Sequence, residues 1–578
     1  MELDSPVAAI IELFSTCQDC YSFYKTRQNA ERKTRVMTKE FDAEASILHS
    51  WGLYWDIHLP NNPNSSKLED YLKQNPHKKH DVVKILLRIG ELMTNNGDLL
   101  KNFGIKLTLS DAQGKSKESK FNEFRVKPED SIDNIGANKA AMRNRVKLLR
   151  KCKWRILRGK NNDFSKLLKA LRKHNTDLRH FCPDGTGKDL NRFLVIAFLN
   201  DHIEFNPLDK ATKRMSQLVQ KEKDPSIKEG LELLRDMVKI KDSAGLHNTE
   251  QISDYHKRHL LRYQLDMLCL RHPEEPSTLA VLTKDDMRSM VYVEFKSYKD
   301  DTRTMTHDRE VVILKLGRLL MVDSKYGSSR LNTMLCLGLF KDSKKKRIGF
   351  IFELPNVKPR KNFVITRNSD WDDYEPCRLS NILNSGTRPF KLNWRLSLAK
   401  EVVDTIIRLH AIGGLHKNIR SDSVLFSSKS YLALARTDYS KHLLMGHDFI
   451  RTDASPTSSQ GGMGKCPDIY HHPDQRKSPD RAYQYAYDIY SLGILLLEIG
   501  LWKSLHQIVR GKQNYSPDRL HKYILETVDV DLPIVCGEIY SSVAKTFISI
   551  ESRNSLKSMN EQRDKCAKMA RELSRCVA

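Results

Sequence analysis

The stretch that decides the fold of the C-terminal half runs from Leu415 to Phe426 and reads LHKNIRSDSVLF. Its apolar ends enclose a polar segment, in which three positions matter most: Asn418, Asp422 and Ser423. An amide such as that of Asn418 is not a base near neutral pH. The hydroxyl of Ser423 is a poorer ligand for a hard cation than a carboxylate or an amide oxygen. The stretch therefore has the outline of a catalytic loop without the groups that such a loop needs.

The pattern on either side of this loop predicts a domain with strands first and helices later. Residues 291–296 (VYVEFK) and 349–353 (GFIFE) are rich in β-branched and aromatic side chains, which favours strands. From residue 391 onward helical spacing dominates, and residues 488–498 (DIYSLGILLLE) predict a buried helix. This order of elements indicates an α+β fold with two lobes.

Several motifs in this half follow the order found in protein kinases, so residues 281–555 resemble a protein-kinase domain. Lys296 stands at the place of the strand lysine that pairs the ATP phosphates. Glu310, in the next predicted helix, is expected to pair with that lysine. The resemblance also implies a gatekeeper and hinge at Phe352 and Glu353, a packing histidine at His416, a metal-binding aspartate at Asp448, and a structural aspartate at Asp488 that ties down the loop backbone.

The same region departs from the kinase pattern in three ways. Asn418 replaces the aspartate that accepts the substrate proton, and Ser423 replaces the asparagine that holds a second Mg²⁺. No glycine lies between Pro276 and Lys296, although a loop that covers phosphates needs glycines; Leu279 to Val291 predict a short hairpin instead. The three defects together predict a pseudokinase without phosphoryl-transfer activity, and leave open whether it binds ATP and Mg²⁺.

An active atypical Ser/Thr kinase is the alternative reading of this half. In it Asp422 would act as the base in place of Asn418. Lys296, Glu310 and Asp448 would then hold ATP and Mg²⁺.

The first 205 residues predict an all-α helical bundle. Apolar residues at i, i+3 and i+4 indicate helices at 5–27, 30–57, 81–100, 136–157 and 162–181, with a polar loop at 108–133. Between Lys139 and Arg179 the chain carries 15 Lys or Arg against only Asp163 and Asp177. Such a basic segment beside an apolar stripe favours an anionic bilayer surface.

This bundle resembles the HeLo domain of fungal heterokaryon-incompatibility and prion-inhibition proteins. The resemblance rests on Pro6-Val7, on residues 48–53 (LHSWGL) with Trp51, and on Trp154 followed by residues 162–171 (NDFSKLLKAL). It implies structural roles for Trp51 and Trp154 and an N-terminal segment that inserts into membranes. The membrane residues so implied are Val7, Ile10, Ile11 and Phe14, with the basic residues Arg143, Arg145, Lys147, Arg150, Lys151 and Lys153.

Composition bounds the partners of the chain. A formal net charge of +25 over 578 residues and a pI near 9.4 point to an anionic partner. The sequence shows no secretion signal and no apolar stretch long enough to span a bilayer, which predicts a cytoplasmic protein recruited to the plasma membrane on activation. Aromatic residues are not interleaved with the basic ones, so no specific nucleic-acid partner is expected.

The expected protein is thus multidomain: a HeLo-like bundle at 1–205, a charged helical connector at 206–280, a kinase-like domain at 281–555 and a charged helix at 556–578. The kinase-like domain would restrain the bundle in a cell-death or incompatibility pathway, until an upstream protein activator or self-association releases it. A basic scaffold that binds acidic protein or nucleic acid without membrane damage remains a further alternative.

Overall fold

The computed structural model describes residues 6–25, 38–57, 66–109, 124, 126, 134–157, 161–200, 220, 224–244, 254–298, 303–324, 329–355, 357–386, 388–426, 442–447, 469–478, 483–512, 514–552 and 556–577. The chain divides into two compact units, Met1–Arg235 and Asp236–Ala578, called here the N-terminal and C-terminal units. The division falls inside helix α11, Pro225–Ala244, within the stretch predicted as a connector. Each unit is described by itself.

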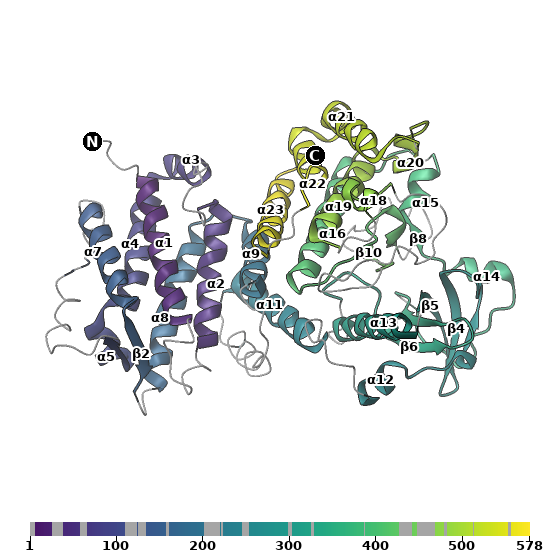
Figure 1. Ribbon diagram of the computed structural model, residues 1–578, viewed down its shortest axis with the longest axis horizontal. Coiled ribbons are helices and arrows are strands. Elements are labelled where there is room, and N and C mark those ends of the chain that lie inside the picture. Colours follow the sequence, from purple (N-terminus) through teal and green to yellow (C-terminus); the bar gives the residue numbers. More distant parts are fainter. Residues whose placement is uncertain are drawn as a thin grey trace. The chain divides into compact units, whose positions relative to one another are not determined.

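Helices dominate the N-terminal unit (Figure 1). They are α1 Pro6–Lys25, α2 Thr38–Trp55, α3 Ser66–Gln74, α4 Pro76–Thr94, α5 Asn96–Phe103, α7 Ile135–Leu149, α8 Asn161–His180 and α9 Gly187–Asn200. Helix α5 shows how the sequence sets such boundaries: the Asn95 side chain accepts a hydrogen bond from the backbone N–H of Asp98 and caps its start. Gly104, in the left-handed conformation, ends it.

A two-stranded sheet departs from the predicted all-α bundle. Strand β1, Ile105–Leu109, pairs antiparallel with β2, Cys152–Ile156, so that Leu107 stands opposite Trp154. The helix predicted at 136–157 therefore ends at Leu149, and its last part is a strand. The reason is the alternation of buried Cys152 and Trp154 with exposed lysine and arginine side chains, which is the period of a strand.

The core of the N-terminal unit is an aromatic cluster around α1. Tyr24 stacks on Phe41 with ring centroids 5.0 Å apart, and its hydroxyl donates to the Met93 carbonyl at 2.8 Å. Trp154, buried on β2, lies edge-on to Tyr24. Phe14 lies against Trp51, also buried, with centroids 5.9 Å apart. Helix α1 packs on α2, α4 and α7, so it is the central helix of this unit.

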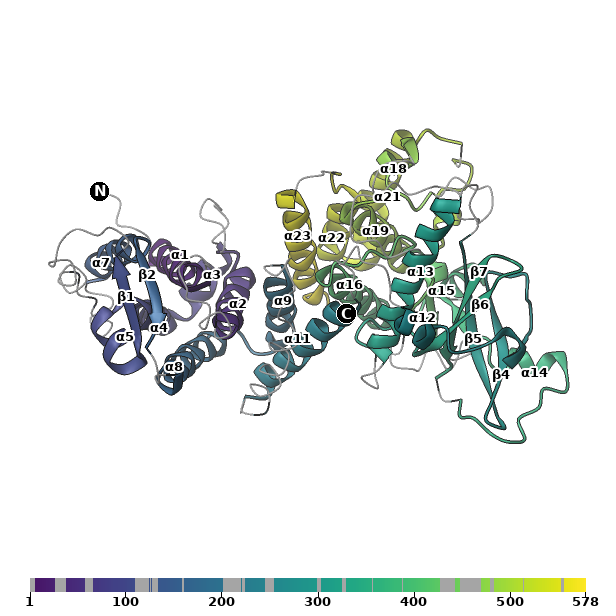
Figure 2. The ribbon, with the colours of Figure 1, turned by 60° about the horizontal axis from the view of Figure 1, so that its bottom comes forward.

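The C-terminal unit contains a five-stranded antiparallel sheet (Figure 2). Its strands are β3 Leu268–Leu270, β4 Ser277–Lys284, β5 Met287–Ser297, β6 Cys336–Asp342 and β7 Arg347–Glu353, in the spatial order β3-β4-β5-β7-β6. Helix α13, Arg303–Ser324, follows β5 in the chain and packs on β6. The strands predicted at 291–296 and 349–353 and the hairpin at 279–291 are all present. The stretch predicted as a charged helical connector is not helical throughout: helix α12, Asp254–Leu260, is followed by strand β3.

Side chains alternate between the two faces of β5. Val291, Val293 and Phe295 join a buried cluster on one face. Tyr292, Glu294 and Lys296 therefore lie on the opposite face. This second face positions the candidate site.

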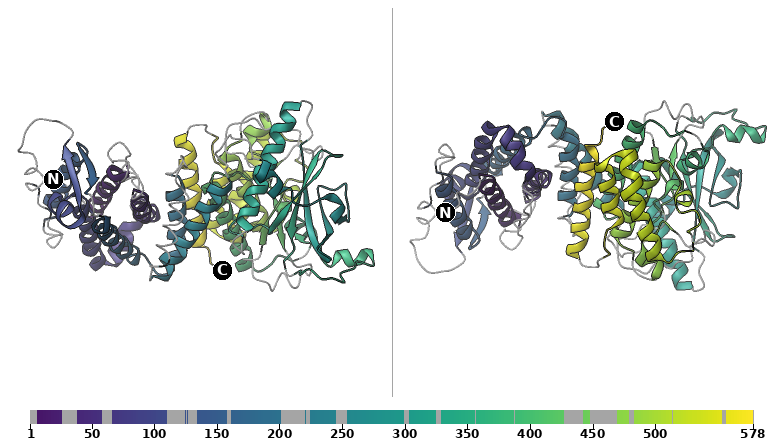
Figure 3. Two further views of the ribbon diagram at one scale, coloured as in Figure 1. Left: turned by 90° about the horizontal axis from the view of Figure 1, so that it is seen from below. Right: turned by 90° about the horizontal axis from the view of Figure 1, so that it is seen from above.

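The rest of the C-terminal unit is mostly helical (Figure 3). The long helices are α16 Leu392–Ala411, α19 Tyr485–Leu501, α21 Pro517–Cys536, α22 Glu538–Ile548 and α23 Leu556–Ser574. Helix α19 is buried over nearly its whole length, and α16, α21, α22 and α23 pack around it. A small sheet of β8 Cys377–Arg378, β9 Val424–Phe426 and β10 His442–Leu444 lies beside them. The shorter elements are α14 Asn368–Asp372, α15 Leu379–Asn384, η5 Ser421–Ser423, α18 Pro473–Lys477 and α20 Leu505–Ile508.

Candidate functional site

The loop before β9 is fixed to helix α19 by one fully buried carboxylate. Asp488 accepts the backbone N–H of His416 at 2.7 Å and that of Lys417 at 2.9 Å. It also accepts hydrogen bonds from His410 Nε2 at 3.1 Å and from the Tyr483 hydroxyl at 2.9 Å. Burial holds the pKa of His410 below its usual value, so this ring is neutral and donates its Nε2–H. Four donors on one carboxylate hold Lys417 in a left-handed conformation, φ 64°, that a non-glycine residue seldom adopts.

Asn418 and Ser423, the two loop residues that depart from the kinase pattern, form hydrogen bonds with backbone groups. The Asn418 side chain donates Nδ2–H to the Gly446 carbonyl at 2.9 Å. The Ser423 hydroxyl donates to the Arg420 carbonyl at 2.7 Å and accepts from the Arg420 N–H at 3.2 Å. Neither group can act as a general base, since one is an amide and the other a neutral hydroxyl held in a local turn.

Asp422, the alternative base, is exposed and already has partners. Its carboxylate accepts the Ser380 hydroxyl at 2.5 Å. Its backbone carbonyl accepts a hydrogen bond from Arg378 at 3.0 Å. The aspartate therefore serves to connect the loop to α15 and β8.

The predicted pairing of Lys296 with Glu310 is wrong. Glu310 forms an ion pair with Lys341 of β6, at 2.6 Å. Lys296 lies 3.9 Å from Glu294, which stands two positions earlier on the same face of β5. Strand alternation brings these two side chains together, whereas Glu310 lies on the part of α13 that meets β6. A carboxylate on the third strand, not one on the helix, is thus the counter-ion of Lys296.

Glu294 is the central residue of the site and was missed by sequence reasoning. It is buried, and its Oε1 accepts the backbone N–H of Gly446 at 3.1 Å. Gly446 thus donates its N–H to Glu294 and accepts at its carbonyl from Asn418. The glycine adopts φ 73°, and a Cβ there would lie 3.2 Å from Asn418 Nδ2, which explains why glycine occupies the position. The signal for Glu294 is its spacing of two residues from Lys296 on a strand.

Two buried histidines lie next to Lys296. The rings of His416 and His447 have centroids 4.3 Å apart. Burial, together with the charge of Lys296, lowers the pKa of His447 to about 3, and burial also lowers the pKa of His416. Both rings are therefore neutral, and His416 accepts the Asn418 N–H at Nδ1, at 3.3 Å.

Three further predicted site residues lie elsewhere. Phe352, which is buried, and Glu353 end strand β7. Asp448 lies outside the described residues.

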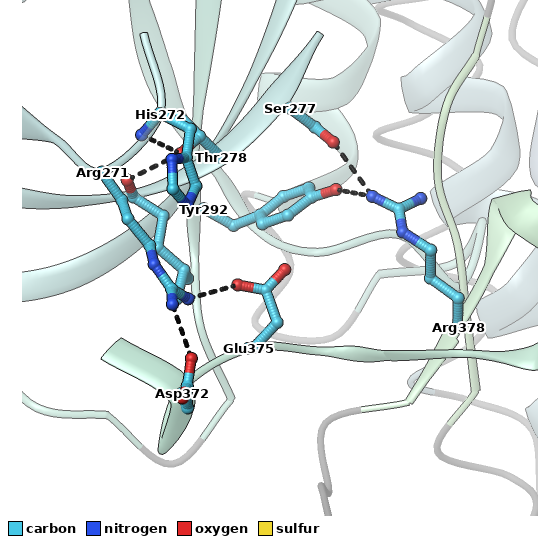
Figure 4. A network of polar contacts seen from close by, with 9 residues as sticks. Arg271, His272, Ser277, Thr278, Tyr292, Asp372, Glu375 and Arg378 are labelled. Carbon is cyan, nitrogen blue, oxygen red and sulfur yellow. Dashed lines mark hydrogen bonds and ion pairs between the residues drawn. The ribbon is translucent and has the colours of Figure 1, made fainter. Parts of the chain in front are cut away.

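A network around Arg378 connects the sheet to the helical part (Figure 4). Arg378 donates to the Tyr292 hydroxyl at 3.0 Å and to the Ser277 hydroxyl at 2.9 Å. Burial raises the pKa of Tyr292 to about 12, so the phenol stays protonated. Because Arg378 also donates to the Asp422 carbonyl, one guanidinium joins β4, β5 and the degenerate loop.

The loop between the first two strands of the sheet spans residues 271–276 and reads RHPEEP. It carries two prolines, two glutamates and no glycine. Arg271 anchors it to Asp372 at 2.5 Å and to Glu375 at 3.4 Å, as Figure 4 shows, and Glu274 pairs with Lys345. The sequence analysis looked for a phosphate-covering loop between Pro276 and Lys296, but the loop between the first two strands of the sheet comes earlier, at residues 271–276. Acidic side chains in it would repel phosphate groups.

The N-terminal unit holds the residues expected to meet a membrane. Val7, Ile10 and Phe14 of α1 are buried in the bundle, and Ile11 is half-buried. In this conformation the apolar stripe of α1 is part of the core. Across the described residues, no helix is both long enough and apolar enough to cross a bilayer.

Ion pairs hold the acidic side chains of α1 to the basic helix α7. Glu12 pairs with Lys139 at 2.8 Å and with Arg143, and Asp19 pairs with Arg150 at 2.8 Å. Glu12 and Asp19 stand seven residues apart, two turns along one face of the helix. Sequence reasoning missed this contact because it counted the basic residues and not the two carboxylates that face them. We call these three pairs the α1–α7 latch.

One of the basic residues predicted to meet a membrane does not belong to an exposed face. Arg145 is buried, and its Nε–H donates to the Phe124 carbonyl at 2.6 Å. Burial lowers the pKa of its guanidinium, although nearby Glu91 opposes that effect. The exposed basic side chains are those of Arg143, Lys147, Arg150, Lys151 and Lys153.

Within the described parts of the chain, no group of three or more histidine, cysteine, aspartate or glutamate side chains is placed to hold a metal ion. No curated protein matches the chain. The resemblance predicted for residues 1–205 is supported over most of that range: residues 5–198 match the HeLo family model, described as prion-inhibition and propagation.

Proposed function

We propose that this chain is a fungal cell-death or incompatibility-type signalling protein with a membrane-targeting N-terminal unit. The C-terminal unit is a kinase-like module without phosphoryl transfer, and it restrains the N-terminal unit in the cytoplasm until an upstream protein activator or self-association releases it. The proposal draws on the HeLo match over residues 5–198 and on the order of kinase-like motifs from Lys296 to Asp488.

The observation that carries the membrane role is the α1–α7 latch. The apolar residues that would enter a bilayer and the carboxylates that cover basic side chains belong to the same helix. A single movement of α1 would therefore expose Ile10 and Phe14 and free Arg143 and Arg150 for anionic lipid. Coupling the two changes to one helix suits a switch with two populated states.

The free energy needed to move α1 out of the bundle makes its release conditional on a membrane. Removing Val7, Ile10, Ile11 and Phe14 from the core costs roughly 1.5–3 kcal/mol for each side chain in water. A bilayer returns this free energy, and each basic side chain near anionic lipid adds about 1 kcal/mol. Neither contribution is present in free solution, so the closed bundle is favoured there.

Two contacts and the composition of one loop support a module without phosphoryl transfer. The Asn418 amide donates a hydrogen bond to the Gly446 carbonyl and cannot act as a base. The buried carboxylate of Glu294 stands beside Lys296, where a nucleotide phosphate would have to lie. The loop at 271–276 has no glycine to bring backbone N–H groups to phosphates.

The latch can be tested on the full chain with Glu12→Gln and Asp19→Asn combined. These changes keep the shapes of the side chains and remove their charges. We expect dye leakage from phosphatidylserine-containing vesicles to rise well above that of the unmodified chain, with little leakage from neutral vesicles.

A matched control removes two carboxylates of the same unit that pair within their own helices. Asp163 pairs with Lys166, and Asp189 pairs with Arg192. Asp163→Asn with Asp189→Asn changes the net charge by the same amount and should leave leakage unchanged. Equal leakage by both variants, or no vesicle binding by a folded latch variant, would contradict the proposed switch.

The restraint can be tested by comparing residues 1–235 with the full chain, after circular dichroism has established that the fragment is helical. We expect the fragment to cause dye leakage from anionic vesicles and the full chain to cause little leakage at the same concentration. A full chain as active as the fragment would remove the restraining role from the proposal.

Nucleotide binding separates the pseudokinase from an active kinase. A ligand present at 100 times its dissociation constant stabilises a protein by about 2.7 kcal/mol. We expect millimolar ATP with Mg²⁺ to leave the unfolding temperature unchanged. A Mg²⁺-dependent increase would instead favour the atypical kinase, with Asp422 as its base.

A further inference from the structure

An exposed apolar surface lies where α21 meets α22, on the helical part of the C-terminal unit (Figure 1). Val530 is 63% exposed, Ile534 82%, Val535 39% and Ile539 37%. These four residues, called here the apolar corner, are half of the large exposed hydrophobic residues found among the described parts of the chain. The others are single positions, Leu100, Leu265, Val364 and Val577.

Packing of the unit does not require the apolar corner. Helix α21 already buries Leu520, Ile524, Val528 and Leu532 on the face that meets α19 and α22. Val530 and Ile534 stand four residues apart on the opposite face. A helix that is apolar on both faces is ordinarily buried, and contiguous exposed apolar side chains mark interaction sites.

Carboxylates surround the corner. Glu526, Asp529, Asp531 and Glu538 are all exposed, and no lysine or arginine occurs between Lys522 and Lys545. Asp529 pairs with Lys545 at 2.8 Å. In a chain with a formal charge of +25 this is a local reversal of sign.

The charges decide which occupant fits. An anionic membrane would be repelled at the point of contact by the carboxylates of Glu526, Asp531 and Glu538. A second copy, docking corner to corner about a two-fold axis, would place the same carboxylates against each other. A basic partner satisfies both the apolar side chains and the acidic rim.

We propose that the apolar corner of α21 and α22 docks a basic amphipathic helix of another protein. Leucine-like anchors at i, i+3, i+4 and i+7 would cover Val530, Ile534, Val535 and Ile539. Lysines and arginines beside them would meet Glu526, Asp531 and Glu538. This deepens the proposed function by giving the upstream activator a docking surface and a chemistry.

The test uses the full chain and a fluorescein-labelled synthetic peptide of 18 residues, with leucines on one helical face and lysines on the other. Fluorescence anisotropy measures its dissociation constant. Ile534→Asp should weaken binding by roughly tenfold, since a central apolar anchor is lost. Asp531→Lys should weaken binding and flatten its dependence on salt.

Three controls make the result decisive. Val364→Asp places the same new charge on another exposed apolar residue, 62% exposed, and should leave the dissociation constant unchanged. A scrambled peptide without a leucine face should bind far more weakly. Sedimentation velocity of the unmodified chain and of Ile534→Asp should give the same oligomeric state.

The proposal is overturned if Ile534→Asp binds the peptide as tightly as the unmodified chain does, or if Val364→Asp weakens binding equally. Equal binding of the scrambled peptide also overturns it. A dimer that Ile534→Asp converts to monomer would assign the corner to a second copy instead. These readouts are independent of vesicle leakage, so this inference and the membrane role can fail separately.

Discussion

Replacing Gly52 by alanine tests how firmly α1 is held in the N-terminal unit. A Cβ at this position of α2 would lie 2.1, 2.6 and 2.8 Å from three atoms of the Phe14 ring. Carbon atoms pack at about 3.5–4.0 Å, so the ring has to move by roughly an ångström or more. Phe14 is fully buried and lies beside Trp51.

The expected magnitude is the difference between two opposing contributions. Alanine is favoured over glycine within a helix by roughly 0.5–1 kcal/mol. Overpacking a filled core costs typically 1–3 kcal/mol, and three contacts below 3.0 Å place this site near the upper end. We therefore expect α1 to be destabilised by about 1–2 kcal/mol, which corresponds to roughly 5- to 30-fold more opening.

Hydrogen exchange followed by mass spectrometry resolves this effect in peptides from residues 6–25. Their protected amides should exchange roughly 5- to 30-fold faster in Gly52→Ala than in the unmodified chain. Gly136→Ala is the matched control, because a Cβ there meets nothing within 4 Å, and its exchange should be unchanged or slower. If exchange in Gly52→Ala is as slow as in the control, the tight packing of α1 on α2 is refuted.

Three further variants probe buried polar groups. Asp488→Asn should lower the free energy of unfolding of the C-terminal unit by roughly 3 kcal/mol in urea titrations, because the new amide N–H would then face one of the four donors to this residue. A loss below about 1 kcal/mol would contradict the role of this carboxylate. Burial lowers the pKa of His447 to about 3, so between pH 6.5 and pH 3 the unfolded chain binds a proton at this residue and the folded chain does not; the free energy of unfolding therefore falls by up to about 1.4 kcal/mol for each pH unit below 6.5. His447→Gln should flatten the dependence of the unfolding free energy on pH between 6.5 and 4.5, measured in urea titrations. An unchanged slope would oppose a neutral buried ring. Glu44→Gln removes the buried negative charge that lies 2.5 Å from Arg172, and should lower the unfolding temperature of the N-terminal unit by several degrees in calorimetry. An unchanged temperature would show that this pair contributes no net stability.

Helical periodicity and strand composition were sufficient for much of the fold. The spacing of Ile10, Phe14 and Tyr21 predicted α1, and the apolar run of residues 488–498 predicted the buried α19. The pairing of β1 with β2 was missed because CKWRI alternates over only five residues and directly follows a long helix. Such a short strand is specified by its partner β1, whose paired residues lie 43 to 51 positions earlier in the chain.

The candidate site was predicted less well, since its contacts are set by tertiary structure. The loop residues His416, Asn418 and Ser423 could be placed from their motif alone. The counter-ion of Lys296 could not, because a helix glutamate and a strand glutamate were both near in sequence, and only the packing of α13 on β6 decides between them. The burial of Arg145 was missed for the same reason: counting charges does not show which face of α7 a residue occupies.

The contact between Asn418 and Gly446 bears on whether a base could be introduced into this loop. Changing Asn418 to the aspartate that the kinase resemblance calls for would replace the Nδ2 donor by an oxygen, 2.9 Å from the Gly446 carbonyl. Two acceptors would then face each other, and Glu294 would be a second carboxylate nearby through its bond to the same glycine. Aspartate would thus fit this position less well than asparagine does. Supplying a base here would require changes at several positions at once, because the amide of Asn418 is one of the groups that hold the loop.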